Sequence, residues 1–222
     1  MKILDADFVT SMPAGGRLPP DAGPVIAMVG RSNVGKSSLI NALIRRGLAR
    51  AGAKPGTTRL VNLYAVRVVP AAGRRTMRST LADLPGYGFA RGGPEARREF
   101  EAIVQDFFEQ ATLRAVSSRG PAAPRLAGVI LLVDGRHPGL ASDVAAQAWL
   151  AEQGHESIVV TTKNDRMSRS AQARARRGHE AALGRPVLPV SSRTGAGVSA
   201  VRAAVGQMLS AATAPVPADG LL

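Results

Sequence analysis

The sequence predicts an α/β fold in three layers, with a mostly parallel six-stranded sheet, one antiparallel strand, and helices on both faces. Short β-type runs alternate with longer helical patterns along the chain, and several of these runs are apolar throughout. Unbroken apolar strands are typical of a sheet that helices cover on both sides. The predicted strands are 25–29, 60–69, 79–83, 128–134, 157–161 and 187–190, and the predicted helices lie near 38–47, 95–114, 141–153, 168–183 and 197–211.

The run at 60–69 differs from the other predicted strands. Two sets of side chains alternate along it, Tyr64 and Val66 on one side and Ala65 and Arg67 on the other. The connection to the strand at 79–83 is short and hairpin-like, through residues 70–73. We therefore expect these two strands to form an antiparallel pair at one side of the sheet.

Length and composition favour one globular domain. The chain has 222 residues, of which 45% are hydrophobic, and we expect a single domain over residues 24–211 rather than two small ones. Residues 1–23 are predicted to form a partly flexible N-terminal extension, and residues 212–222 a flexible C-terminal tail. The Pro- and Gly-rich residues 13–24 and the Ala- and Pro-rich residues 211–222 are expected to lie outside the core.

The absence of cysteine excludes several kinds of chemistry. Disulfides, thiolate metal sites and thiol nucleophiles are ruled out, which fits a reducing compartment. The N-terminus lacks the basic-then-apolar order of a signal peptide, and apolar runs such as 129–133 are too short to cross a bilayer. We expect a cytoplasmic protein with no membrane partner.

The charge balance is strongly basic. Lys and Arg total 29 against 16 Asp and Glu, which gives a formal net charge of +13 and a pI near 11.5. Such a charge indicates a polyanionic partner. An alternative stays open, because a composition rich in Ala, Arg and Gly can raise the charge without any specific site.

A phosphate-binding loop follows the first predicted strand. Residues 30–37 fit the pattern G-x-x-x-x-G-K-S/T, with an apolar run before them and an amphipathic helix after them. In this pattern glycines let successive N–H groups surround phosphate oxygens, and the helix N-terminus faces the anion. Lys36 is expected to reach the β- and γ-phosphates and the Ser37 hydroxyl to bind Mg²⁺. The predicted loop consists of Gly30, Arg31, Ser32, Asn33, Val34, Gly35, Lys36 and Ser37.

Two further segments are candidates for contact with the γ-phosphate and the metal. After the strand at 79–83, the Asp83 carboxylate is expected to hold Mg²⁺ through water, and the Gly86 N–H to reach the γ-phosphate. The loop at 54–59 offers hydroxyls that can close over the γ-phosphate, with Thr58 as the better Mg²⁺ ligand. The residues concerned are Gly56, Thr57, Thr58, Arg59 and Leu60 in one segment, and Asp83, Leu84, Pro85 and Gly86 in the other.

A tetrad after the strand at 157–161 selects the base. Asp165 can accept two hydrogen bonds from guanine N1–H and the 2-amino group, a pattern that adenine cannot supply, and the Lys163 stem can lie along the base. At the end of the last strand, the Ser192 backbone N–H is a candidate donor to guanine O6, although a plain turn explains the serines almost equally well when they are considered in isolation. These segments are Thr162, Lys163, Asn164 and Asp165, and Val190, Ser191 and Ser192.

The five elements in this order, with D-L-P-G-Y-G at 83–88 and D-x-R-H-P at 134–138, closely resemble the EngB (YihA/YsxC) family of bacterial GTPases over about residues 8–205. The resemblance implies a P-loop GTPase (G domain) that binds GTP or GDP on these five segments, with Mg²⁺ on Ser37 and Thr58. It also implies a role in assembly of the large ribosomal subunit, linked to cell division and septation. Asn164 departs from the family, which usually has Ala there.

The hydrolytic machinery looks incomplete. Tyr87 stands where many GTPases carry a glutamine that orients the attacking water. We expect slow intrinsic hydrolysis, with Lys36, Thr58 and Gly86 as the catalytic residues and a partner that accelerates the reaction; Tyr87 is equally compatible with a packing role. For Asn33, two interpretations stay open: a ligand that helps hold K⁺, or a tight-turn residue.

Arginines supply candidate contacts to RNA phosphates. The leading hypothesis is a monomeric GTP-hydrolysing switch that docks on a precursor of the large ribosomal subunit and its rRNA. The alternative is a nucleotide-dependent, non-hydrolysing scaffold in cell division. The candidate arginines are Arg166, Arg169, Arg174, Arg176, Arg177, Arg185 and Arg193, with Arg97, Arg98 and Arg114 on or near the helix after Asp83.

Overall fold

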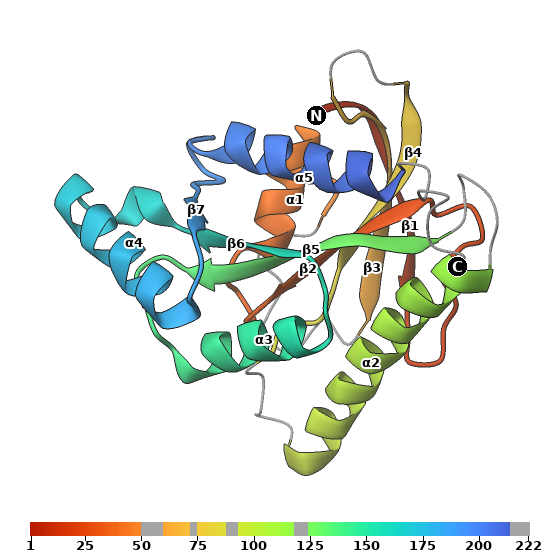
Figure 1. Cartoon of the computed structure of the whole chain (residues 1–222), viewed down its shortest axis with the longest axis horizontal. Helices are drawn as coiled ribbons and strands as arrows, with labels where there is room; N and C mark the ends of the chain where they lie inside the picture. The colour runs from red at the N-terminus through yellow and green to blue at the C-terminus, as the bar shows by residue number, and fades with distance from the viewer. Residues whose placement is uncertain (50–59, 72–74, 88–92, 118–123, 214–222) are drawn as a thin grey trace, which may run out of the picture.

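The computed structural model describes residues 1–49, 60–71, 75–87, 93–117 and 124–213 (Figure 1). They form a seven-stranded sheet in the order β1-β3-β4-β2-β5-β6-β7, with helices on both faces. The strands are β1 (Lys2–Met12), β2 (Pro24–Gly30), β3 (Val61–Val69), β4 (Met77–Asp83), β5 (Arg125–Asp134), β6 (Ser157–Thr162) and β7 (Val187–Pro189). The helices are α1 (Lys36–Ile44), α2 (Gly93–Ser117), α3 (Ala141–Glu152), α4 (Arg169–Leu183) and α5 (Val198–Ala212), with a short 3₁₀ helix, η2 (Asn164–Arg166).

The predicted fold class is confirmed. Strand β2 pairs in parallel with β4 and β5, and β5, β6 and β7 continue the parallel sheet. Strands β3 and β4 form the predicted antiparallel pair, in register from Asn62↔Asp83 to Val68↔Met77. The predicted elements all recur with their ends shifted by a few residues.

The strand count is the main difference from the expected six. Within the predicted N-terminal extension, β1 pairs antiparallel with β3 from Lys2↔Val69 to Met12↔Val61. It has one neighbour only and two irregularities in its register, so most of its side chains are exposed and the regular alternation of a strand is lost. Its buried side chains are Ala6 and Met12. The pattern that finds a strand in a sequence is therefore weak here.

Residues 13–23 also contribute to the core, contrary to expectation. Leu18 and Ala22 are 1% and 2% exposed and belong to the cluster beneath α2. Helix α2 holds the segment through polar contacts: Gln110 accepts from the Leu18 N–H at 3.1 Å and Asp106 from the Gly15 N–H at 2.7 Å. The Pro- and Gly-rich composition of this segment fits its irregular backbone but does not predict its contacts with Asp106 and Gln110.

Two hydrophobic clusters, one on each face of the sheet, explain why the central strands are apolar throughout. Along β2, Ile26 and Met28 join the cluster with α1 and α5, while Val25 and Ala27 join the cluster with α2 and α3. Figure 1 shows α1 and α5 on one side of the sheet and α2 and α3 on the other. Each side chain of β2 therefore faces one of two buried layers.

The order of the strands places the site. Strands β2 and β5 are neighbours, but β2 leads on to β3 on one side and β5 leads on to β6 on the other. Ligands in such sheets bind at the carboxyl ends of the strands near this reversal. Four of the five segments predicted to bind a nucleotide follow the carboxyl ends of β2, β4, β6 and β7, and the fifth, residues 56–60, precedes β3 in the chain. In the part of the chain that the structure describes, no helix is both long and apolar enough to cross a membrane.

Candidate nucleotide-binding site

The loop between β2 and α1 is compact and opens toward the helix N-terminus. Gly30 ends β2, and a Cβ at this position would lie 2.6 Å from the Leu132 carbonyl oxygen, so only glycine fits. Asn33 and Gly35 take left-handed φ values of 58° and 117°, which turn the chain into α1 at Lys36. The first N–H groups of α1 thus face the loop, as an anion site requires.

Lys36 lies over this loop. Its Nζ donates to the carbonyl oxygens of Gly30 at 3.4 Å and Arg31 at 3.5 Å. Burial lowers the pKa of Lys36, while the nearby Asp83 carboxylate raises it. The ammonium group is thus held at the centre of the loop, where it can meet a phosphate.

Ser37 and Asp83 face each other across the loop. The Ser37 hydroxyl donates to Asp83 Oδ2 at 2.7 Å, and the other carboxylate oxygen, Oδ1, is buried without a hydrogen-bond partner in the described part of the chain. Burial raises the pKa of Asp83, against the lowering effects of Lys36 and the Ser37 hydrogen bond. A hydroxyl and an orphaned carboxylate oxygen suit Mg²⁺, a hard cation that keeps several waters and binds few protein ligands.

The second expected metal ligand, Thr58, lies outside the described residues, as do Gly56, Thr57 and Arg59. Leu60, the last residue of that segment, is 37% exposed.

Hydrogen bonds join the segment after β4 to the phosphate loop. Ser32 N–H donates to the Tyr87 carbonyl at 3.1 Å, and the Ser32 hydroxyl to the Gly86 carbonyl at 3.3 Å. The backbones of Arg31 and Tyr87 form an isolated parallel bridge. Leu84 and Pro85, between Asp83 and Gly86, are buried. These hydrogen bonds place Gly86 next to the position where a γ-phosphate is expected.

Tyr87 packs against the protein rather than facing the loop. Its ring contacts the core cluster beneath α2, and its hydroxyl donates to Asp143 on α3 at 2.9 Å. Burial is the main reason that the Tyr87 pKa is raised. This arrangement agrees with the packing role that the sequence left open for Tyr87. Asp143 was not among the residues singled out from the sequence.

The tetrad after β6 reaches back to the phosphate loop. The Thr162 hydroxyl donates to the Val34 carbonyl at 2.7 Å, and Lys163 Nζ donates to the Asn33 carbonyl at 2.7 Å. Lys163 Nζ also lies 3.0 Å from Asp134 Oδ2, at the end of β5. The structure therefore brings two of the predicted segments into direct contact.

Asn164 ties the tetrad to the last predicted segment. Its side-chain amide donates to the Thr161 carbonyl at 2.7 Å and to the Val190 carbonyl at 3.0 Å. Asn164 is 8% exposed, so its side chain acts within the protein interior. The departure from the family's usual Ala is thus explained by a structural contact.

Asp165 is held from two sides. The Ser191 hydroxyl donates to Oδ1 at 2.6 Å and Arg193 Nε to Oδ2 at 2.8 Å. Both contacts lower the pKa of Asp165. The sequence predicts a contact from the Ser192 backbone and places Arg193 among the arginines that face RNA, but it predicts neither the Ser191 hydroxyl contact nor the Arg193 ion pair. No motif of adjacent residues indicates a contact across this sequence distance.

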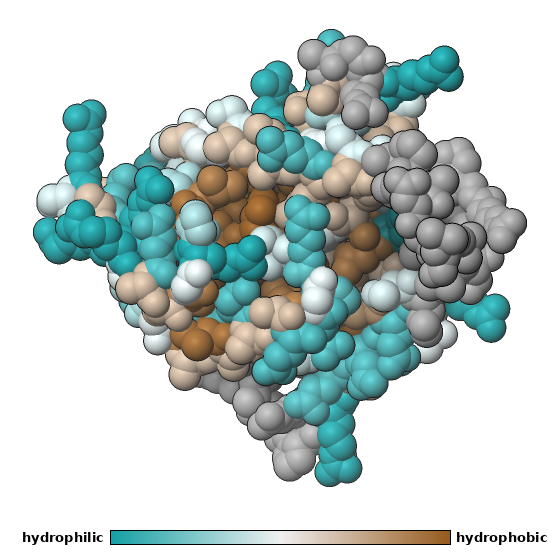
Figure 2. All heavy atoms as spheres, in the orientation of Figure 1, coloured by the Kyte–Doolittle hydropathy of each residue, from teal (hydrophilic) through white to brown (hydrophobic). Residues whose placement is uncertain are grey.

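Helix α4 and its flanks form an arginine-rich surface, and Figure 2 shows hydrophilic side chains gathered over α4. Arg176 pairs with Glu180 at 2.9 Å, and Arg185 donates to the Ser157 hydroxyl at 2.7 Å. Arg98 is exposed, while the side chains of Arg97 and Arg114 lie outside the described set. On helix α4 and its flanks, the exposed arginines without an ion pair to any described residue are Arg166, Arg169, Arg174 and Arg177.

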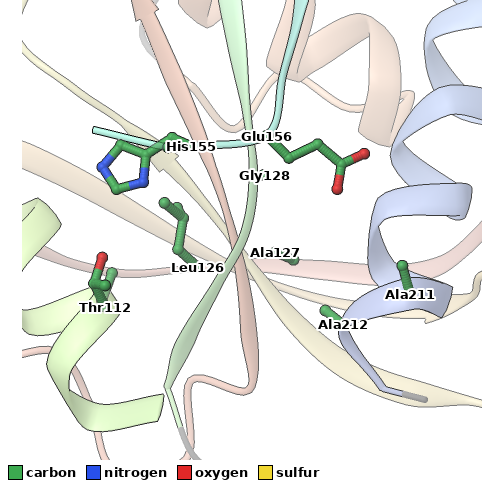
Figure 3. Close-up of a pocket in the computed structure, with 10 residues that line it drawn as sticks. Thr112, Leu126, Ala127, Gly128, His155, Glu156, Ala211 and Ala212 are labelled. Carbon is green, nitrogen blue, oxygen red and sulfur yellow. The ribbon is translucent and has the colours of Figure 1, made fainter. Parts of the chain in front are cut away.

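A cavity of about 390 Å³ lies away from these motifs (Figure 3). It is lined by the start of β5, the α3–β6 connection with His155 and Glu156, and the end of α5 at Ala211 and Ala212. The start of β5 and the α3–β6 connection lie at the amino ends of their strands, whereas four of the five nucleotide-binding segments follow the carboxyl ends of theirs. The cavity therefore lies at the opposite edge of the sheet from the candidate site.

Comparison with known families agrees with this geometry. The family model described as "50S ribosome-binding GTPase" matches residues 25–163. A probable GTP-binding protein EngB from Anaeromyxobacter sp. is 34% identical over 223 residues, covering 98% of this chain and 97% of the relative. Relatives of the same description from Pelotomaculum thermopropionicum and Clostridium perfringens are 38% and 37% identical, over 79% and 84% of this chain and 78% and 84% of their own.

Solved structures share the fold. A crystal structure of a probable GTP-binding protein EngB aligns with a TM-score of 0.59 and 22% identity, over 84% of this chain and 99% of that one. Translation elongation factor SelB from Methanococcus maripaludis, solved with a GTP analogue, aligns with a TM-score of 0.57 and 16% identity, over 90% of this chain and 36% of SelB. At these identities the likeness is one of fold.

Proposed function

This chain belongs to the EngB family of GTP-binding proteins, and from that premise we propose that its GTPase cycle serves the assembly of the large ribosomal subunit. GTP binding and a GTPase switch follow from the family itself. The observation that carries the ribosomal role is the match of residues 25–163 to a family described as 50S ribosome-binding GTPases. The protein acts in the cytoplasm as a monomer, and the link to cell division and septation follows from the same family resemblance.

The nucleotide sits across the carboxyl edge of the sheet. The α1 N-terminus and Lys36 receive the β- and γ-phosphates, and Asp165 receives the guanine edge. Ser37, Asp83 and Thr58 would hold Mg²⁺, which would compensate for charge on the phosphates. The orphaned Asp83 Oδ1, beside the Ser37 hydroxyl, is the support for this metal site.

Intrinsic hydrolysis is slow because Tyr87 replaces the water-orienting glutamine of many GTPases and its hydroxyl is engaged by Asp143. Lys36 and the backbone of Gly86 stabilise the charge on the transferring phosphoryl group. Asn33 is exposed, and its side chain makes no hydrogen bond to another described residue, so it is available to help hold K⁺. Equal hydrolysis rates in K⁺ and Na⁺ would exclude that use of Asn33.

The surface over α4 faces rRNA. Its four exposed arginines without ion pairs give a local positive field in a chain whose formal net charge is +13. Arginine binds phosphate through a planar fork of donors, and each neutralised phosphate adds to the salt dependence of binding. The alternative of a non-hydrolysing scaffold has no observation in its favour, because the family is one of GTPases.

Co-sedimentation with large ribosomal subunits at fixed, near-physiological salt tests the proposal. We expect binding in the presence of a non-hydrolysable GTP analogue to exceed binding with GDP. Arg174→Gln combined with Arg177→Gln should weaken binding about tenfold. The matched control, Arg67→Gln with Arg75→Gln, also removes two exposed arginines, near β3 and β4 at the other side of the sheet, and should bind as the wild type does. Equal binding in both nucleotide states, or none, would refute the ribosomal switch.

A further inference from the structure

Asp134, at the end of β5, is a buried carboxylate that two cations share. Arg136 approaches it in a bidentate manner, with Nε 2.9 Å from Oδ1 and Nη2 2.7 Å from Oδ2, and its backbone N–H donates to Oδ1 at 3.1 Å. Lys163 Nζ donates to Oδ2 at 3.0 Å. The Asp134 side chain is 9% exposed, so these contacts replace nearly all of its water.

Lys163 has the longest reach in this group, because its Nζ contacts both the phosphate loop and Asp134. Its backbone takes a left-handed φ of 58° just before η2, and its long side chain runs back to the phosphate loop, where Nζ donates to the Asn33 carbonyl at 2.7 Å. Lys163 has many rotamers to lose, and Asp134 supplies the one charged partner that the described residues offer its ammonium group. The Asp134 contact therefore favours the side-chain conformation in which Lys163 Nζ joins β5 to the phosphate loop.

We propose that Asp134, oriented by Arg136, is a positioning residue for guanine-nucleotide binding, and that it acts by holding Lys163 against the phosphate loop. This gives a role to the D-x-R string after β5, none of whose residues is part of the five nucleotide-binding segments. The proposal depends on GTP binding, which the family establishes, and is independent of the ribosomal role.

The charges explain why two cations are needed. A buried carboxylate with Lys163 as its only partner would cancel the lysine's charge beside the phosphates, whereas the triad of Asp134, Arg136 and Lys163 keeps a net positive charge. Burial raises the pKa of Asp134, but hydrogen bonds from Arg136 and Lys163 outweigh this effect and hold its pKa well below the usual range. The Asp134 carboxylate therefore remains ionised and paired with Lys163 at neutral pH.

Nucleotide affinity of the purified chain, measured by calorimetry without ribosomes, tests the proposal. We expect Asp134→Asn to weaken GDP and a non-hydrolysable GTP analogue by the same factor, about tenfold or more, because a charge-assisted hydrogen bond is lost. The matched control is Asp21→Asn, which removes an aspartate paired with Arg78 at 2.7 Å before β2, and should leave both affinities unchanged.

A double-mutant cycle separates positioning from a general structural effect. If Asp134 acts through Lys163, Asp134→Asn adds no further loss of GDP affinity in a Lys163→Met background. Losses that add in full, or an Asp134→Asn variant that binds GDP as the wild type does, would overturn the proposal. Because no ribosome is present, these outcomes are independent of the co-sedimentation result.

A second variant keeps the test valid if Asp134→Asn fails to fold. Arg136→Gln leaves the Asp134–Lys163 contact in place and removes the fork that orients the carboxylate; Arg136 is 34% exposed, so its loss is tolerated better. We expect a smaller loss of GDP affinity, about threefold, that disappears in the Lys163→Met background. An equal loss in both backgrounds would overturn the proposal.

Discussion

The Tyr87 hydroxyl donates a hydrogen bond of 2.9 Å to Asp143 Oδ1, which joins the segment after β4 to helix α3. Asp143 is 2% exposed, and its other oxygen, Oδ2, has no hydrogen-bond partner among the described residues. The pair thus links two segments that follow different strands of the parallel sheet, β4 and β5. This hydrogen bond also engages the Tyr87 hydroxyl, the one polar side-chain group with which Tyr87 could act on water.

Tyr87→Phe separates the hydroxyl from the ring. The substitution leaves Asp143 with two unsatisfied buried oxygens, so we expect a loss of about 1–3 kcal/mol in the free energy of unfolding, measured in urea. Single-turnover GTP hydrolysis should stay within about twofold of the wild-type rate, because the hydroxyl is directed at α3. A fall of about a hundredfold, the usual cost of losing a general acid or base, would instead place the hydroxyl in the chemistry.

The buried side chain of His179 predicts that stability falls as the pH falls. Its side chain is on α4, 1% exposed, and burial lowers its pKa, against the opposing effects of the Gly135 backbone, Asp143 and Asp134. Because the folded pKa lies below the ordinary value of about 6.5, the stabilising contribution is complete above that pH and is lost as the pH falls. Asp143 acts in the opposite direction, since burial raises its pKa.

The matched comparison is with His155, whose pKa burial also lowers and which stacks on Phe108 at 4.8 Å. Urea unfolding between about pH 5 and 7 should show stability rising with pH, by at most about 1.4 kcal/mol per pH unit from each histidine. His179→Gln should flatten this slope more than His155→Gln, since His155 is only half-buried. A slope unchanged in His179→Gln would mean that His179 does not titrate differently on folding.

The sequence predicts best what a strong local pattern encodes. Strand β2 is found because both its faces are buried, and four of the five candidate site segments are found because each follows a strand. Edge strand β1 is missed because one neighbour and two register irregularities leave it without a buried face. Contacts such as Lys163 with Asp134, or Ser191 with Asp165, depend on which strands become neighbours, and that order is a property of the whole sheet.

Ser191 makes the sharpest test of the guanine end of the site. Its hydroxyl donates to Asp165 and accepts from the Thr194 N–H at 3.1 Å, so Ser191→Ala leaves the carboxylate held by Arg193 alone. We expect GDP affinity, measured by calorimetry, to fall about tenfold, as one hydrogen bond to a charged group is lost. Ser192→Ala is the control, because it keeps the backbone N–H proposed to meet guanine O6 and should change the affinity little. If Ser192→Ala lowers GDP affinity more than Ser191→Ala does, the prediction is wrong and the important hydroxyl is that of Ser192.

Gly86 packs so closely against the phosphate loop that any side chain at this position must displace the loop. A Cβ at Gly86 would lie 2.5 Å from the Ser32 backbone nitrogen and 2.6 Å from Ser32 Cα, and neither backbone atom can move aside cheaply. Gly86→Ala should therefore break the Ser32–Tyr87 backbone hydrogen bond and cost about 1–3 kcal/mol of stability in urea unfolding. Affinity for a GTP analogue should fall more than affinity for GDP, because the Gly86 N–H is proposed to meet only the γ-phosphate. Gly47→Ala is the control, since a Cβ there meets no atom within 4 Å. Equal losses of both nucleotides would indicate that Gly86 supports the loop as a whole and does not sense the γ-phosphate.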